Sequence, residues 1–232
     1  MPNEIVLLSN ISQKILKNKK TTLGVGLLSN QNKKLYNSLV FLNSEGKIKY
    51  HYNKIHLVPF GEYIPFRGHL SPITNFLSPR DFSPGSFEQN YHLKGFGEIV
   101  PLICYEILFS DEVHEKISEK TKLLINITND AWFGKSVGPS QHLSLAKIRA
   151  VELGLPLARV ANTGFSAFIS PYGEEIIKIP LYVSDTKTVS LYPRLEDTLY
   201  KNYGEYIFFI SIIYIMVINL VTNRKKEEFN EK

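Results

Sequence analysis

The sequence predicts an α/β layered domain followed by one apolar helix. Short apolar and β-branched runs alternate with helical patterns over residues 1–193. Strands interleaved with helices in this way are typical of layered α/β domains. A later run, Tyr206–Val221, is apolar, carries no charge and lies close to the C-terminus. Its uniform hydrophobicity distinguishes it from the alternating pattern before it.

The composition is that of a folded chain. Of the 232 residues, 44% are hydrophobic and 21% are charged, which is near the average for folded domains and excludes a disordered or collagen-like chain. A mean hydropathy of -0.09 argues against several membrane spans. The net charge of +5 is mild and no long basic run precedes the C-terminus, so we predict no nucleic-acid partner. A single cysteine excludes an internal disulfide and a cysteine-rich zinc site.

The first half of the chain predicts mainly strands. The runs are Thr22–Leu28, Leu35–Leu42 and Lys47–Tyr52, with a turn at Asn43–Gly46. Glu98–Ile103 is a short apolar run that ends immediately before Cys104, and we expect a strand there. Ser110 and Asp111 are suitable capping residues for a helix that extends to about Lys120.

The second half alternates more regularly between the two kinds of element. Leu123–Thr128 is a β-branched run typical of a buried strand, and Ser140–Leu153 has the apolar spacing of an amphipathic helix. Further strands are predicted at Leu157–Ala161, Ser166–Ser170, Glu175–Ile179 and Thr188–Leu191, with a turn at Pro171–Gly173. These elements would complete the layered domain.

The run Tyr206–Val221 is a candidate membrane span. At ~1.5 Å per residue it covers about 24 Å, and flanking residues out to Thr222 bring it near the lower limit for a ~30 Å hydrocarbon core. Lys225 and Lys226 follow it, which predicts a cytoplasmic tail and an external location for the preceding domain. The alternative is a buried core helix.

The predicted organisation has four parts. We expect a domain over residues 1–193, a linker over 194–205, a transmembrane helix over 206–222 and a tail over 223–232. The N-terminus lacks the apolar region of a secretory signal. The chain therefore carries an anchor of the exported type without an export signal of its own.

Cys104 and Lys54 are the first candidates for chemistry. Cys104 follows an apolar strand, and a side chain at the end of a strand is exposed at the edge of the sheet, where nucleophiles are common. A buried structural cysteine is the alternative. Lys54 lies in a loop with His56, Gly61, Glu62 and two prolines and could stabilise a thiolate or an oxyanion. Its alternative is an ordinary surface lysine.

Acidic and aromatic residues supply further candidates. Glu62 or Glu106 could accept a proton from the thiol, or each could be a surface carboxylate or a hydrogen-bonding partner. Asn129–Gly134, with the single tryptophan, follows a buried strand and could form a pocket wall. A later polar set could act near it or could form simple ion pairs; its members are Arg149, Glu152, Arg159 and Asn162–Gly164.

Together these segments resemble a known family. The matching segments are Lys54–Pro65, Ile103–Glu106, Asn129–Gly134, Arg149–Glu152 and Arg159–Gly164. They resemble the apolipoprotein N-acyltransferases, a membrane branch of the nitrilase (carbon–nitrogen hydrolase) superfamily. The resemblance implies a nitrilase-type αββα sandwich that faces the periplasm of a bacterial inner membrane, with one membrane helix after it and several before it.

The resemblance also implies a reaction. In a Glu-Lys-Cys triad, Cys104 would attack the sn-1 ester of a phospholipid, and Lys54 would stabilise the oxyanion. The acyl-thioester would then pass its acyl group to the α-amino group of an S-diacylglyceryl-cysteine on an apolipoprotein. Active-site supports would be Glu62, Tyr105 and Glu106. Candidates for the substrate pocket would be Phe60, Tyr63, Trp132 and Phe133.

The sequence departs from the family at one position. The family's general-base glutamate lies in a Trp-Pro-Glu segment upstream of the lysine, and no such segment precedes Lys54. Glu4 has different neighbours and no strand before it. We therefore expect the C-terminal portion of an N-acyltransferase, from a truncated or split gene, with a separately encoded N-terminal piece as a possible partner. Such a domain would lack its first segment and leave a sheet edge uncovered.

Two other functions stay open from the sequence. The same cysteine and lysine could serve an amidase or nitrilase-like hydrolase that uses water as acceptor. The missing glutamate would also fit an inactive remnant. No cofactor or metal is predicted, because the chain has no phosphate-binding glycine loop and its histidines lack ligand spacing.

Overall fold

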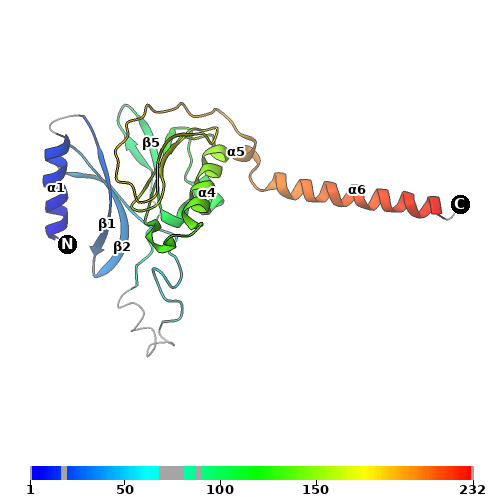
Figure 1. The fold of residues 1–232 in the computed structure, drawn as a ribbon, viewed down its shortest axis with the longest axis horizontal. Coiled ribbons are helices and arrows are strands. Elements are labelled where there is room, and N and C mark those ends of the chain that lie inside the picture. The colour runs from blue at the N-terminus through cyan, green and yellow to red at the C-terminus, as the bar shows by residue number, and fades with distance from the viewer. Residues whose placement is uncertain (1, 17–19, 68–80, 87–89, 231–232) are drawn as a thin grey trace.

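A computed structural model describes residues 2–16, 20–67, 81–86 and 90–230 of the chain. The strands of this part form two sheets (Figure 1). The first sheet has the order β1-β2-β3 and is antiparallel, with β1 at Leu23–Gln31, β2 at Lys34–Leu42 and β3 at Ile48–Asn53. The β1–β2 turn is Asn32-Lys33, where both residues have positive φ, as a tight hairpin with right-handed twist requires.

The second sheet has six strands in the order β4-β5-β6-β7-β8-β9. Their bounds are Tyr91–Leu93, Gly97–Ile103, Thr121–Thr128, Leu157–Ala161, Ser166–Ile169 and Glu175–Ile179. The central strands β5, β6 and β7 are parallel, and the outer pairs are antiparallel. Because side chains alternate along a strand, one face of this sheet meets the first sheet and the other meets a helix.

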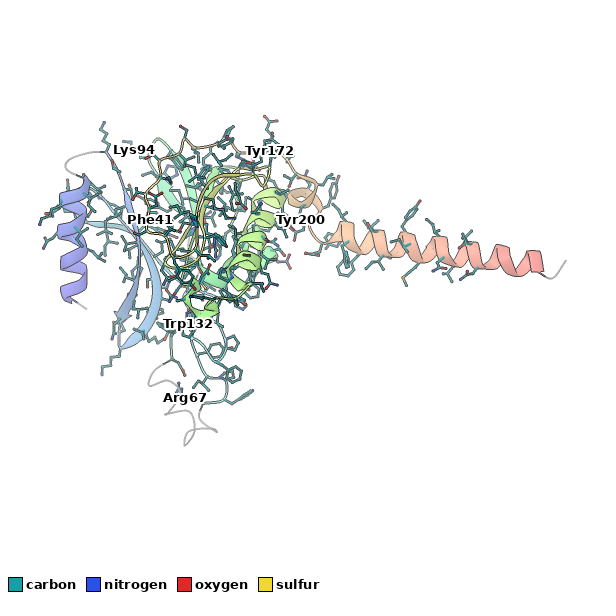
Figure 2. All side chains as sticks on the ribbon, in the orientation of Figure 1. Phe41, Arg67, Lys94, Trp132, Tyr172 and Tyr200 are labelled. Carbon is teal, nitrogen blue, oxygen red and sulfur yellow. The ribbon has the colours of Figure 1, made fainter. Side chains whose placement is uncertain are left out.

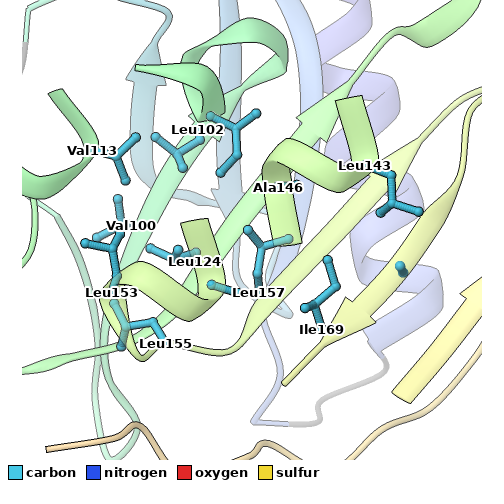
Figure 3. Packing of buried hydrophobic residues seen from close by; sticks show 13 residues of the cluster. Val100, Leu102, Val113, Leu124, Leu143, Ala146, Leu153, Leu155, Leu157 and Ile169 are labelled. Atoms are coloured by element: carbon cyan, nitrogen blue, oxygen red, sulfur yellow. The ribbon is translucent and has the colours of Figure 1, made fainter. Parts of the chain in front are cut away.

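Two apolar cores follow from that alternation. Between the sheets, Leu39 and Phe41 of β2 pack with Ile99 and Ile103 of β5 and with Leu123 of β6. On the opposite face of the six-stranded sheet, residues of β5, β6 and β7 pack against helix α4 (Figure 3). This second core contains Val100, Leu102, Leu124 and Leu157 from the sheet and Leu143, Ala146, Ala150 and Leu153 from the helix.

The helices cover the outer faces of the two sheets. Helix α4 (Gly138–Leu153) lies on the six-stranded sheet, and α1 (Pro2–Leu16) lies beside the three-stranded sheet (Figure 1). In α1, Ser12 Oγ donates to the Asn43 carbonyl at 2.8 Å, which fixes the helix to the β2–β3 turn. The order helix, sheet, sheet, helix confirms the predicted αββα sandwich. No element was predicted for Pro2–Leu16 from the sequence.

Two predicted elements differ from the structure. The strand predicted at Thr188–Leu191 is wrong, because this segment joins no sheet; its Val189 side chain packs on the core, but its backbone has no strand partner. The helix predicted from Ser110 to about Lys120 is shorter and ends at Glu115. Lys116 then turns its side chain into the protein, where its Nζ donates to Tyr52 Oη at 2.9 Å.

The C-terminal run forms helix α6 (Tyr206–Asn230), which extends away from the sandwich (Figure 1). The short helix α5 (Leu199–Tyr203) precedes it, inside the segment predicted as a linker. Within the described residues, one helix is long and apolar enough to cross a membrane, over Tyr206–Asn223, and none of this window is buried.

Candidate active site

Cys104 occupies a sharp turn where β5 ends. It is the first residue of the short 3-10 helix η1 (Cys104–Leu108) and has a φ of 54°. This left-handed conformation is uncommon for a residue other than glycine. A strained turn between a strand and a helix is the arrangement that presents a nucleophile at the edge of an α/β sheet. The cysteine is half-buried.

Lys54 follows β3 directly and is almost completely buried, with 1% of its surface exposed. Its backbone N–H donates to the Asn37 carbonyl at 2.8 Å, which continues the pairing between β3 and β2. Its Nζ donates to Glu62 Oε2 at 2.6 Å. A buried ammonium requires such a partner, since an unpaired charge in the interior is costly.

Glu62 is itself held by two further donors. The Val58 backbone N–H donates to Oε2 at 2.9 Å, and Asn37 Nδ2 donates to Oε1 at 3.0 Å. The carboxylate is therefore fixed by a loop and by a strand while it bonds Lys54. Asn37 is a site residue that the sequence reasoning missed, because a single asparagine inside a predicted strand carries no distinctive signal.

A cavity of about 1080 Å³ lies between the two sheets and contains these groups. Cys104, Lys54, Glu62 and Trp132 all line it, so four of the predicted site residues meet in one space. Most of the other lining residues are apolar side chains from both sheets. Among the described residues that line the cavity, Glu62 is the only carboxylate.

The remaining predicted pocket residues lie elsewhere. Phe60 is 76% exposed and does not line the cavity, and Tyr63 is half-buried outside it. Phe133 and Tyr105 both lie near the His142 ring instead, with ring centroids 5.9 and 5.7 Å from it. Trp132 lines the cavity although 76% of its surface is exposed, so it lies at the rim of the cavity. Figure 2 shows Trp132 at the lower edge of the sandwich.

Glu106 connects the loops that carry the lysine and the cysteine. It is buried and does not line the cavity. Its Oε1 accepts from the Ile55 N–H at 2.7 Å and from the His56 N–H at 3.3 Å, directly after Lys54. Its Oε2 accepts from the Ile103 N–H at 2.7 Å, directly before Cys104. One carboxylate therefore fixes the positions of both residues.

Tyr52 and Lys116 complete this connection. Tyr52 Oη donates to Glu106 Oε1 at 2.8 Å and accepts from Lys116 Nζ at 2.9 Å. Burial and the neighbouring Glu106 carboxylate raise the pKa of Tyr52 far above its usual range. Burial lowers the pKa of Lys116. The ammonium lies close enough to the buried carboxylate to offset part of its charge.

A second buried polar group lies behind the Cys104 turn and was only partly anticipated. It consists of Asn126, Asp130, His142 and Arg159. Asn126 and Arg159 occupy positions of β6 and β7 that face α4, where Leu124 and Leu157 precede them. Polar residues in the inward register of apolar strands are the signal that could have identified the group.

Arg149 and Glu152 of the predicted polar set form a separate pair on α4. The Arg149 guanidinium donates to the Glu152 carboxylate, and neither residue lines the cavity. Burial raises the pKa of Glu152. This pair lies next to the α5 end of the helix, where Thr198 Oγ1 donates to the Glu152 carbonyl. Among the described residues, no group of three His, Cys, Asp or Glu side chains is placed to hold a metal ion.

The family model described as carbon–nitrogen hydrolase matches residues 9–192. The chain belongs to the carbon–nitrogen hydrolase family. Two solved members have a similar fold: yeast Nit3 from Saccharomyces cerevisiae, with a TM-score of 0.58 at 20% identity, and a carbon–nitrogen hydrolase from Helicobacter pylori, with a TM-score of 0.56 at 18% identity. Each alignment covers 77% of this chain, and 61% and 63% of the respective neighbours.

Several apolipoprotein N-acyltransferases are similar to this chain over most of its length. The chain is 36% identical to that of Haemophilus ducreyi over 98% of its own length and 40% identical to that of Wigglesworthia glossinidia brevipalpis over 88%. These alignments confirm the resemblance that the motifs indicate. They cover 46% and 42% of the two relatives, so this carbon–nitrogen hydrolase chain spans less than half the length of either.

Proposed function

We propose that this chain carries the acyl-transfer centre of an apolipoprotein N-acyltransferase. The acyl donor is a phospholipid, and the acceptor is the α-amino group of an S-diacylglyceryl-cysteine at the N-terminus of a lipoprotein. The observation that carries the proposal is the shared cavity: a cysteine at a strained strand end and a buried, carboxylate-paired lysine face one apolar space. The similarity to N-acyltransferases supports the choice of substrates.

The proposed reaction has two steps. The Cys104 thiolate attacks the ester carbonyl carbon, and the carbonyl electron pair moves to oxygen, where the Lys54 ammonium stabilises it. The pair then returns, the ester C–O bond breaks, and the lysophospholipid leaves as an alcohol after taking up a proton. In the second step the acceptor amine attacks the thioester, the C–S bond breaks as an amide forms, the thiolate is released, and the amine loses a proton to the general base. Glu62 keeps Lys54 oriented through both steps.

The proton acceptor and the missing part of the sandwich are proposed to come from polypeptide outside this sequence. The three-stranded sheet faces a sheet of six strands, so the overlap is partial. Val160 on β7 and Leu28 on β1 line the cavity yet are 58% and 48% exposed. A strand added beside β1 would cover them and could bring a general-base carboxylate to the cavity. A longer chain or a separately encoded N-terminal piece would each supply such a strand.

We further propose that α6 anchors the domain in a bacterial inner membrane. The domain (residues 1–193) would lie in the periplasm, joined by residues 194–205 to a span over 206–222, with residues 223–232 in the cytoplasm. The apolar surface of the helix, exposed along Tyr206–Asn223, supports this arrangement. An anchor of this kind would hold the cavity near both lipid substrates.

The test is detection of the intermediate. The full chain, alone and co-expressed with the N-terminal half of a related N-acyltransferase, is incubated with a phospholipid that carries an isotopic label in its sn-1 acyl chain. We expect a labelled acyl group on Cys104 by mass spectrometry, removable by neutral hydroxylamine, and its transfer to a diacylglyceryl peptide. Cys104→Ala is the matched control. Equal labelling of Cys104→Ala refutes the assignment of Cys104 as the nucleophile. Release of free fatty acid without peptide acylation indicates a hydrolase instead.

A further inference from the structure

The buried polar group behind the Cys104 turn lies on the α4 side of the six-stranded sheet, away from the cavity. Its members come from β6, the η2 turn (Asp130–Phe133), α4 and β7: Asn126, Asp130, His142 and Arg159. All four are buried, and the side chains of Asp130 and Arg159 are completely excluded from solvent. Burying a guanidinium lowers the stability of the fold unless the group is paired, so the positions of its partners are fixed.

Arg159 joins the other three members. Its Nη1 donates to Asn126 Oδ1, and its Nη2 donates to Asp130 Oδ2 at 2.8 Å. The same Nη2 lies 3.0 Å from His142 Nδ1. Leu102, Asn126 and Arg159 are neighbours across β5, β6 and β7, so the guanidinium lies level with the end of β5. The Arg159 guanidinium therefore fixes the side chains of Asn126 and His142, which both approach the Cys104 turn.

The side chains of Asn126 and His142 both contact one backbone oxygen. Asn126 Nδ2 donates to the Cys104 carbonyl at 3.2 Å, and His142 Nε2 lies 3.3 Å from the same oxygen. Because a carbonyl oxygen only accepts, His142 Nε2 carries the hydrogen. His142 Nδ1 then faces Arg159 and also Asp130, whose Oδ1 is 3.0 Å away. The Cys104 carbonyl thus has two donors of fixed direction.

Fixing this carbonyl also fixes the next backbone N–H. The C=O and N–H of a trans peptide point in opposite directions, and the described chain has no cis peptide bond. With the Cys104 carbonyl turned into the polar group, the Tyr105 N–H points away from it. Tyr105 is the second residue of η1, where an N–H has no acceptor within the helix. An N–H directly after a nucleophile can stabilise an oxyanion.

We infer that His142 and Asn126 are positioning residues that orient the Cys104–Tyr105 peptide so that the Tyr105 N–H meets the oxyanion formed on the acyl group. The inference rests on the proposed role of Cys104 as nucleophile. Neither His142 nor Asn126 lines the cavity, so they act through the peptide and do not contact the acyl group. Arg159 and Asp130 hold them from behind.

Two thiol reagents separate this role from a general structural one. With p-nitrophenyl acetate, the Cys104 sulfur bonds to the carbonyl carbon, the electron pair moves to oxygen, and its return expels p-nitrophenolate. With iodoacetamide, sulfur bonds to the methylene carbon as iodide leaves, and no oxyanion forms. Both reactions consume the same thiolate. The ratio of the two second-order rate constants, measured on the full chain by mass spectrometry of Cys104, therefore reports stabilisation of the oxyanion separately from thiol reactivity.

The expected result is a selective loss. His142→Met removes one donor to the Cys104 carbonyl, and we expect the acetylation-to-alkylation ratio to fall about 10- to 100-fold, less than the roughly 100- to 1000-fold for outright loss of an oxyanion donor. His142→Gln keeps a side-chain N–H and should recover most of the ratio. Ser144→Ala, on the exposed side of the same helix, should leave it unchanged. If His142→Met does not fold, Asn126→Asp carries the same expectation, because it keeps an acceptor for Arg159 and loses the donor to Cys104.

Three outcomes overturn the inference. His142→Met could change both rate constants in proportion or neither, His142→Gln could be as slow as His142→Met, or the wild-type chain could be alkylated but never acetylated at Cys104. A different result separates the two proposals: if Cys104 reacts with both reagents as described but never with phospholipid, the proposed substrate is wrong and the positioning role stands.

Discussion

The Glu106 carboxylate accepts a hydrogen bond from the backbone N–H of Ile55 at 2.7 Å. Ile55 directly follows Lys54, and Glu106 lies two residues after Cys104. The relative position of the lysine and the cysteine therefore depends on one buried carboxylate that does not line the cavity. This arrangement predicts that changes at Glu106 affect folding and reactivity together.

Glu106→Gln tests this dependence. A carboxylate only accepts, whereas an amide brings its own hydrogens toward the N–H groups of Ile55 and Ile103. We expect the free energy of unfolding to fall by about 2–3 kcal/mol, as for loss of a buried hydrogen bond to a charged group. Urea unfolding measures it, with Glu115→Gln on the exposed side of α3 (Ser110–Glu115) as control. Equal stability of the two variants would contradict the connecting role of Glu106.

Lys54→Met tests the proposed oxyanion stabiliser. The change removes the ammonium and leaves Glu62 with only its Val58 and Asn37 donors. We expect acylation of Cys104 to slow by about 100-fold or more, measured as adduct formation with p-nitrophenyl acetate. Lys49→Met, at an exposed position on β3, is the matched control. Wild-type acylation rates in Lys54→Met would exclude a role in the chemical step.

Asp130→Asn tests the electrostatics of the buried polar group. Burial alone would raise the pKa of Asp130, but the His142 hydrogen bond and the Arg159 charge together hold it below the usual 3.8. The stabilisation by the Asp130 carboxylate is therefore fully present above pH 3.8. It is lost as the pH falls through the lower pKa that Asp130 has in the folded protein. The variant leaves Arg159 without its anionic partner and should lose about 3–5 kcal/mol near neutral pH.

The pH dependence supplies the check. Urea unfolding at pH 7 and at about pH 3 should show a difference between wild type and Asp130→Asn that shrinks on acidification. Asp185→Asn, at an exposed ion pair, should show a small difference at both pH values. If the difference in unfolding free energy between wild type and Asp130→Asn grew at low pH, the assigned direction of the Asp130 pKa shift would be wrong.

Hydrogen exchange tests the proposed added strand. Among the described strands, β1 pairs with β2 alone, so every second N–H along Leu23–Gln31 lacks a ladder partner. We expect rapid exchange of these amides in the isolated chain and slowing of about tenfold or more when the N-terminal half of a related enzyme is co-expressed. Peptides over Ser166–Ile169, which is paired on both sides, are the internal reference. No slowing in β1 would place the partner elsewhere.

Truncation tests the membrane helix. The full chain should sediment with membranes and resist carbonate extraction, because α6 exposes a continuous apolar surface. Deletion of residues 206–232 should move the chain to the carbonate-soluble fraction. Deletion of residues 223–232 alone should leave it in the membrane pellet. Carbonate extraction of the full chain would show that α6 does not span the bilayer.

Most strands of the domain are predicted well because they have strong local signals, whereas the sandwich arrangement was implied by the family resemblance. Leu123–Thr128 is an apolar, β-branched run, and it and Leu157–Ala161 form β6 and β7 within a residue or two of the predicted bounds. The strand predicted at Thr188–Leu191 has a similar composition but finds no partner backbone. Pairing is a property of the whole fold, and local composition does not contain it.

The site residues likewise include some with a local sequence signal and some without one. The strand end predicted for Cys104 and the shaped loop predicted for Lys54 follow from neighbouring residues alone. His142 was not singled out, because one histidine on a largely apolar helix has no local signal for a role. Its contacts with Asp130 and the Cys104 carbonyl span 12 and 38 residues of sequence. Such relationships appear only once the strands and α4 are packed together.

The φ of 54° at Cys104 has a consequence for how this position tolerates change. Folding alone favours glycine or asparagine in the left-handed region, where other residues lose roughly 1–2 kcal/mol. Cysteine here lowers the stability of the domain, and glycine would raise it while removing the thiol. Under the proposed role of Cys104 as nucleophile, variants selected only for thermal resistance would lose the reactive thiol at residue 104. Any stabilisation programme for this chain must hold that residue fixed and look for its gains elsewhere.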